Sequence, residues 1–222
     1  GSTVCANATI NLTSPAGGIS YAWTGPSAYS SAAQNPSIAN ATAAMSGTYS
    51  LTMTNPGGCV GTGTTNVTVN ALPIVTVSGN TVCTNATINL TSTGGTIYSW
   101  TGPGAYTSAA QNPTIANASA AMTGTYSVTV TNAFGCTMGT TFSVGVNALP
   151  TISISGNNTI CSGQNATLTG NGGNTYVWST TQSTNPILVS PSTSVGYTVT
   201  GTDSKGCSDT ASIFVSVTPA PV

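Results

Sequence analysis

An internal repeat constrains this chain more than any other feature of its sequence. The segment VCANATINLTSPAGGISYAWT (4–24) returns as VCTNATINLTSTGGTIYSWT (82–101), and residues 25–55 return almost unchanged as residues 102–132. A third copy is more diverged and shorter in its middle, but it keeps four landmarks, which are Cys161, Trp178, Tyr197 and Cys207. A repeat of this length is typically one folding unit. We therefore expect three domains in series, which are 1–72, 73–149 and 150–222.

Proline-containing segments separate the expected domains. The sequence NALP occurs at 70–73 and again at 147–150, and TPAP occurs at 218–221. Proline and the residue before it favour extended backbone, and proline-containing linkers are stiff. The domains should therefore form an extended row.

The two ends of the chain predict an incomplete first domain. Gly1 aligns with Gly79, so domain one lacks the apolar stretch 74–78 that precedes Gly79 in domain two. Val222 aligns with Ile74, the first residue of that stretch. We expect domain one to lack its opening strand, as in a segment of a longer array. The alternative is an expressed fragment with a boundary inside a domain.

Alternation with period two predicts strands throughout the chain. Tyr126, Val128 and Val130 fall on one face of an extended segment, with Ser and Thr between them. No window shows a helical stripe, and Thr, Val, Gly and Pro all disfavour helix. Short strands separated by turn residues at this spacing indicate an all-β chain of sandwich domains. The same alternation occurs in the other copies at Tyr49, Leu51 and Met53, at Tyr197 and Val199, at Ile10 and Leu12, and at Ile88 and Leu90.

The order of landmarks resembles an immunoglobulin-like sandwich of seven strands. A strand ending in Tyr-x-Trp precedes the motif Ala-x-Met-x-Gly-Thr-Tyr and a long alternating strand. Immunoglobulin-like domains have a buried Trp on the third strand and a tyrosine corner at the sixth. The antibody-type disulfide is absent, because its second position holds Leu51, Val128 or Val199. The resemblance implies that Trp23, Trp100 and Trp178 are core residues.

The third copy also resembles a bacterial family. ICSGQNATLT (160–169), YVWST (176–180) and YTVTGTDSKGC (197–207) are similar to the Ig-like or PKD-like repeats of Bacteroidetes surface proteins. That family comprises large adhesins and gliding-associated proteins exported by the type IX system. The resemblance covers all three domains and implies a cell-surface location. Such repeats serve as stalks beneath many different functional tips.

Charged residues are nearly absent, which excludes most chemistry. The chain holds one Lys (Lys205), two Asp (Asp203 and Asp209) and no Arg, Glu or His. General acid–base catalysis requires a titratable group, so we predict no enzyme and no cofactor. Two carboxylates fall short of the six to eight oxygens that Ca²⁺ prefers, so no metal site is expected. One Lys cannot neutralise nucleic-acid phosphates, and no apolar run reaches the ~18 residues of a membrane-spanning helix.

Six Cys residues, two in each domain, indicate disulfides and an extracellular location. Pairing within domains would give Cys5–Cys59, Cys83–Cys136 and Cys161–Cys207. In an immunoglobulin-like sandwich, however, the first Cys of each domain would lie in the turn before the second strand. The second Cys would follow the last hairpin, at the opposite end, roughly 20–26 Å away. A disulfide needs Cα atoms within about 7 Å.

Pairing across the short linkers removes this conflict in distance. Cys5 would meet Cys136, and Cys83 would meet Cys207, which leaves Cys59 and Cys161 for neighbouring segments. We favour this scheme. Pairing within domains and free thiols remain the alternatives.

Two further types of surface site are candidates. Tyr29 and Tyr106 lie in Gly-Pro loops and could stack on a sugar ring, although a loop Tyr more often folds over the end of a sandwich. Thr210 lies in Asp-Thr-Ala (209–211), which resembles the O-glycosylation motif of the same bacterial group. The alternative for this triplet is a turn at the start of a strand.

The hypothesis we favour is a non-catalytic structural segment of a surface filament or adhesin stalk. Near-zero net charge promotes association, so copies of the chain or adjoining repeats are the expected partners. The alternative is a carbohydrate-binding adhesin module that binds surface polysaccharide through Tyr29, Tyr106 and polar Asn and Thr loops. No nucleic-acid partner and no membrane insertion are expected.

Overall fold

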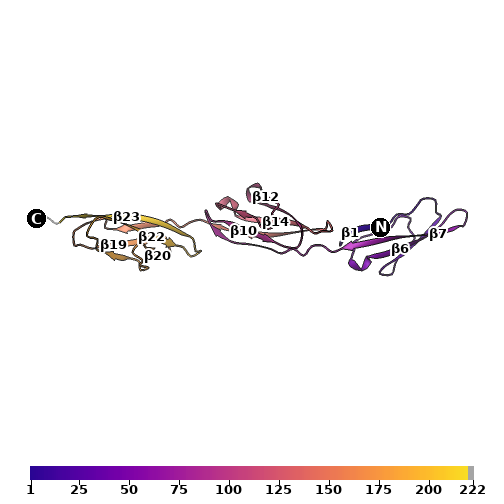
Figure 1. The fold of residues 1–222 in the computed structure, drawn as a ribbon, viewed down its shortest axis with the longest axis horizontal. Helices are drawn as coiled ribbons and strands as arrows, with labels where there is room; N and C mark the ends of the chain where they lie inside the picture. Colours follow the sequence, from indigo (N-terminus) through magenta and orange to yellow (C-terminus); the bar gives the residue numbers. More distant parts are fainter. Residues whose placement is uncertain (220–222) are drawn as a thin grey trace.

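Three β-sandwiches lie in an extended row in the computed structural model, which describes residues 1–219 (Figure 1). Each sandwich has its own hydrophobic core, and no core cluster includes residues of another domain. The predicted fold class, tandem immunoglobulin-like domains, is confirmed by the strands and by their pairing. Val222, which aligns with Ile74, lies outside the described residues.

Domain two shows the complete strand arrangement. Its opening strand is divided: β8 pairs antiparallel with β10 in one sheet, and β9 pairs parallel with β16 next to the other sheet. This division of the first strand between two sheets is an immunoglobulin-like feature. One sheet contains β8 (Val77–Gly79), β10 (Ile88–Ser92) and β13 (Thr114–Ile115). The other contains β12 (Tyr106–Ser108), β11 (Ile97–Gly102), β14 (Gly124–Thr131) and β15 (Thr137–Val144), with β9 (Val82–Cys83) and β16 (Val146–Asn147) as a separate pair.

Domain three has the same order of strands as domain two, except that its described residues contain no strand equivalent to β12. One sheet contains β17 (Ser153–Gly156), β19 (Ala166–Asn171) and β21 (Ile187–Val189). The other contains β18 (Thr159–Cys161), β23 (Ser208–Thr218), β22 (Val195–Thr202) and β20 (Thr175–Trp178).

Domain one differs at its opening strand. Its β1 pairs parallel with β7 and corresponds to β9, whereas the described residues hold no equivalent of β8. Domain one therefore keeps the second half of the opening strand, which refines the expectation that the whole strand is missing. The large sheet contains β1 (Ser2–Cys5), β7 (Val60–Asn70), β6 (Gly47–Thr54), β3 (Ser20–Gly25) and β4 (Tyr29–Ser31), and β2 (Ile10–Asn11) pairs with β5 (Ser37–Ile38).

Each core contains the Trp that the sequence predicts to be a core residue. Trp23, Trp100 and Trp178 are 3%, 0% and 2% exposed, so the prediction of core residues is confirmed. The alternating face of β14 is also buried, because Tyr126, Val128 and Val130 are at most 1% exposed.

The tyrosine corner forms in the first two domains. The hydroxyl of Tyr49 donates a hydrogen bond to the carbonyl of Met45 at 2.9 Å, and that of Tyr126 donates to Met122 at 3.0 Å. Both acceptors end short 3-10 helices, which are η1 (Ala43–Met45) and η3 (Ala120–Met122). A third such helix, η2 (Pro103–Ala105), lies in the Gly-Pro loop of domain two. Domain three has the shorter middle section and no helix in its described residues, and Tyr197 is buried there without that bond.

Candidate functional site: the disulfide-bonded domain junctions

The first Cys of each domain is the last residue of a strand and also the first residue of the turn before the next strand, because its carbonyl accepts the turn hydrogen bond from Ala8, Ala86 or Gln164. Cys5, Cys83 and Cys161 end β1, β9 and β18. Their strand partners are Asn70, Asn147 and Thr218, the last residues of the closing strands. Each of these Cys residues therefore lies beside the point where the chain leaves its domain.

The second Cys of each domain follows a hairpin turn that has the same hydrogen bonds in all three domains. In domain two, the Asn132 side chain accepts hydrogen bonds from the backbone amides of Phe134 and Cys136, both at 3.0 Å. Gly135 has a φ of 79°, a conformation that glycine adopts without steric cost. The same turn is built on Asn55 in domain one and on Asp203 in domain three.

Two disulfides join these ends across the domain boundaries. Cys5 is bonded to Cys136 with a Cα–Cα distance of 5.5 Å, and Cys83 is bonded to Cys207 with a distance of 5.6 Å. The first bond links domain one to domain two, and the second links domain two to domain three. Cys136 and Cys207 are fully buried, so the bonds are packed inside the junctions.

Each junction thus has two covalent connections between neighbouring domains. The peptide linkers are residues 71–76 and 148–152, and each disulfide lies beside its linker. At the first junction, the side-chain amide of Asn132 also donates a hydrogen bond to the carbonyl of Ala71 in the linker, at 2.9 Å. Asp203 occupies the same position at the second junction and, as a carboxylate, has no proton to donate.

The remaining Cys residues, Cys59 and Cys161, are unpaired and exposed. They occupy the same positions in their domains as the bonded Cys136 and Cys83. Cys59 lies in the hairpin turn of domain one, and Cys161 ends β18 beside the end of β23. The strands β6 and β7, which this turn joins, belong to the domain at one end of the row, and β23 belongs to the domain at the other end (Figure 1).

The loop Tyr residues fold against the tyrosine corners. The ring of Tyr29 packs edge-on against Tyr49 at a centroid distance of 5.6 Å, and Tyr106 packs in the same way against Tyr126 at 5.7 Å. Both loop rings are half-buried. Beside Tyr106 is a hollow of about 200 Å³, lined mainly by Pro103, Gly104, Ile115, Ser119, Ala121 and Met122.

The other candidate residues lie apart from the junction disulfides and from the loop Tyr residues. Thr210 is exposed near the start of β23, after the turn, and its amide donates a hydrogen bond to the Asp209 carboxylate at 2.8 Å. Residues 1–219 contain no group of three or more His, Cys, Asp or Glu that could hold a metal ion. None of the helices in the described part of the chain could span a membrane.

The divided opening strand, the Trp-centred cores and the sheet order define the chain as a row of immunoglobulin-like domains. No protein-family profile and no curated protein matches the sequence. Among solved structures, an I-band fragment of titin is 12% identical, with a TM-score of 0.49 and coverage of 99% of this chain and 95% of that chain. The three N-terminal domains of the bacteriophage RB49 highly immunogenic outer capsid protein are 15% identical, with a TM-score of 0.43 and coverage of 99% and 96%. These similarities are too distant to carry an argument about function.

Proposed function

We propose that the chain is a non-catalytic structural segment of an extracellular filament or adhesin stalk. The observation that carries this proposal is the pair of disulfides between domains. A linker alone, although stiff, is a single covalent connection and still allows one domain to rotate relative to the next. A disulfide beside the linker adds a second covalent path and restricts that angle. Such junctions suit a protein that transmits tension along its length.

Composition supports the same function. Disulfides persist in oxidising compartments, which favours a location outside the cell. Near-zero net charge promotes association between copies. With a single Lys and no Arg, the chain offers almost no site to trypsin-like proteases, which is useful in an exposed filament. The resemblance to Bacteroidetes surface repeats adds the cell surface as the location.

Assembly would use the two free Cys residues. At both internal junctions, the Cys at the end of a short strand bonds to the hairpin Cys of the following domain. Continued in the same direction, Cys161 of one copy would bond to Cys59 of the next. Asn55 would then donate to the carbonyl of Pro219, because Pro219 follows Thr218 as Ala71 follows Asn70.

Oxidation of the purified chain tests this assembly. We expect a ladder of linear multimers on non-reducing gels that collapses to monomer after reduction, and a peptide pair linking Cys59 to Cys161 by mass spectrometry. The variants Cys59→Ser and Cys161→Ser should each stop the ladder, and an equal mixture of the two should stop at dimers. A chain that stays monomeric under oxidation, or multimers linked through Cys59 pairs alone, would contradict the proposal.

A carbohydrate-binding adhesin module is the second candidate. It is favoured by the half-buried rings of Tyr29 and Tyr106 and by the hollow beside Tyr106. Glycan-array binding that is lost in Tyr29→Ala and Tyr106→Ala, with domain stability retained, would support it. Mass spectrometry of the native protein tests Thr210 separately as an O-glycosylation site.

A further inference from the structure

Each domain has one parallel pair of strands, formed by its opening and closing strands. These pairs are β1 with β7, β9 with β16, and β18 with β23. Every other strand pair within residues 1–219 is antiparallel. The two strands of each parallel pair therefore run side by side toward the end of the domain where the chain leaves it.

The junction disulfides connect these pairs into two continuous covalent paths. The first path consists of residues 1–5 and 136–161, joined by the bond Cys5–Cys136, and the second consists of residues 59–83 and 207–218, joined by Cys83–Cys207. Each path runs through all three domains and includes one linker and one disulfide. Each domain contributes one strand of its parallel pair to each path.

Most of every sandwich lies outside the two paths. The omitted segments are 6–58, 84–135 and 162–206, and they contain the Trp and the buried Tyr of each domain. In each domain only two buried residues of the core cluster lie on the paths, which are Val67 and Val69, Val82 and Val144, and Ile160 and Val215. The cores are therefore attached beside the paths and are not links within them.

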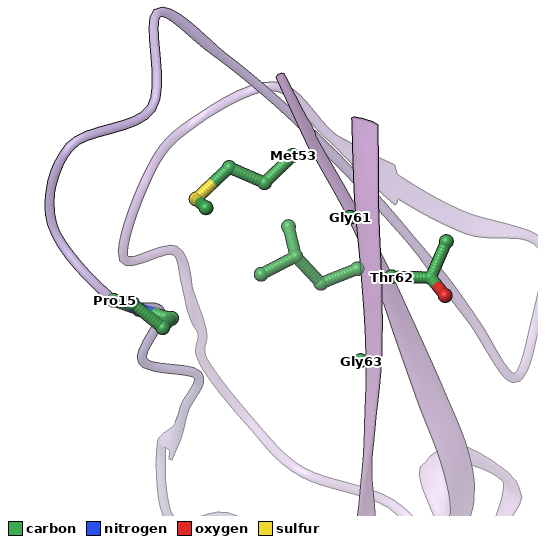
Figure 2. A pocket seen from close by; sticks show the side chains of 6 residues that line it. Pro15, Met53, Gly61, Thr62 and Gly63 are labelled. Atoms are coloured by element: carbon green, nitrogen blue, oxygen red, sulfur yellow. The ribbon is translucent and has the colours of Figure 1, made fainter. Parts of the chain in front are cut away.

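The strands on the paths are already close to their full length. A strand rises about 3.4 Å per residue, and a fully extended chain spans at most about 3.6 Å per residue. Figure 2 shows Gly61, Thr62 and Gly63 in line along β7 on the second path, whereas Met53 and Pro15 belong to the sandwich outside it. Tension along either path can therefore add little length.

We propose that tension along the row passes through these two covalent paths and bypasses the cores of the domains. This inference deepens the proposed structural function and rests on it for the source of the tension. In a domain held only through its first and last strands, tension would shear the parallel pair apart and draw out the chain between them. Here both strands of each pair continue covalently into the neighbouring domain, so unfolding of one sandwich would not lengthen a path.

The two exposed Cys residues lie at ends of these paths. Cys161 is the last residue of the first path, and Cys59 is the first residue of the second. A bond between Cys161 of one copy and Cys59 of the next, as proposed above, would therefore join one path to another without including a core.

Single-molecule pulling on the first path tests the proposal. The full chain carrying Cys59→Ser is held at its N-terminus and, through a thioether, at Cys161. We expect no unfolding step and an extension that stays near about 100 Å, because this path contains about 30 residues at ~3.4 Å each. After reduction of the disulfides, the same pull should show unfolding steps and a roughly fivefold greater extension, since every residue from 1 to 161 then carries the tension.

Matched disulfide variants separate the two paths. Cys83→Ser with Cys207→Ser opens only the second path and should leave the result of this pull unchanged. Cys5→Ser with Cys136→Ser opens the first path and should produce unfolding steps. The parent chain held at its N-terminus and C-terminus should also unfold in steps, because tension must then cross from the first path to the second.

The proposal is overturned if the oxidised chain unfolds stepwise when it is held by the two ends of the first path. It is also overturned if reduction does not lengthen the chain, or if the two disulfide variants behave alike. These outcomes do not bear on assembly through Cys59 and Cys161, because the chain used lacks Cys59. Failure of the multimer ladder would instead contradict the proposed assembly and would leave the pulling result unchanged.

Discussion

At the scale of single residues, each domain depends on one Trp and one Tyr. The indole side chains fill the centres of the three cores, and the Tyr residues at the start of β6, β14 and β22 are buried beside them. Because the domains have separate cores, the effect of a core substitution should be confined to its own domain.

Replacing any one Trp with Ala should destabilise that domain by about 3–5 kcal/mol. The lost contacts and the resulting cavity account for the cost, since all three side chains are at most 3% exposed. Chemical denaturation, followed separately in each domain, measures this loss of stability. A loss below about 1 kcal/mol in a folded variant would contradict the assignment of that Trp to the core.

Alkaline pH should weaken domains one and two. Burial, and secondarily the neighbouring Tyr29, raises the pKa of Tyr49 above its ordinary value of 10.0. Burial, and secondarily Tyr106, raises the pKa of Tyr126 in the same way. The unfolded chain loses these protons first, so the stability that they contribute is complete below about pH 10 and is lost as the pH rises further.

This pH dependence is measured by denaturation between pH 8 and 11 in the chain with Cys59→Ser and Cys161→Ser, because free thiolates would attack the disulfides. Tyr49→Phe should lower the stability of domain one by about 0.5–1.5 kcal/mol at neutral pH, because the hydrogen bond is lost. The stability of this variant should then fall less steeply as the pH rises. If the stability of that variant falls with pH as steeply as that of the parent chain, the pH dependence comes from groups other than Tyr49.

At the scale of elements, the hairpin turn before each closing strand positions the junction. Asn132 has two roles, because its oxygen accepts two turn amides and its nitrogen donates to Ala71 of the preceding linker. Asp203 carries out the first role alone. The turn design is therefore shared by all domains, whereas the contact across the linker is specific to the first junction.

Asn132→Ala should lower the stability of domain two by about 1–3 kcal/mol, because the buried amide of Cys136 loses its side-chain acceptor. Asn132→Asp should keep both turn bonds and lose only the contact with Ala71. Denaturation of domain two, together with residual dipolar couplings for the angle between domains one and two, separates these effects. Equal losses of domain stability in the two variants would show that the acceptor role is unimportant.

At the scale of the whole molecule, the disulfides determine how rigid the row is. Closing strands of 11 residues at ~3.4 Å per residue suggest domains of roughly 25–40 Å and a rod of roughly 100 Å. The linkers alone are stiff but still allow one domain to rotate relative to the next.

Replacing Cys5 and Cys136 with Ser should broaden the distribution of angles between domains one and two, while each domain keeps its unfolding midpoint. Small-angle scattering should show a rod for the parent chain and a shorter mean dimension for the variant. A compact three-lobed particle in the parent chain would contradict the extended row. Identical profiles for both chains would show that the linker alone is rigid.

The fold class and most of the core residues can be predicted from the sequence alone. The inward-facing side chains are indicated by patterns in the sequence, which are the 77-residue repeat, the period-two alternation and the Trp and Tyr landmarks. Each strand carries this information within a few residues, because successive side chains point to opposite faces. The scarcity of charge likewise limited the plausible functions before any contact was known.

The pairing of strand edges and the contacts across a linker are visible only in the three-dimensional structure. The pairing of β9 with β16, which places Cys83 beside the end of the closing strand, joins segments more than 60 residues apart, and no local sequence pattern records it. The contact between Asn132 and Ala71 joins residues 61 positions apart in different domains. Such features arise from contacts between distant segments, which the alternation within a single strand does not record.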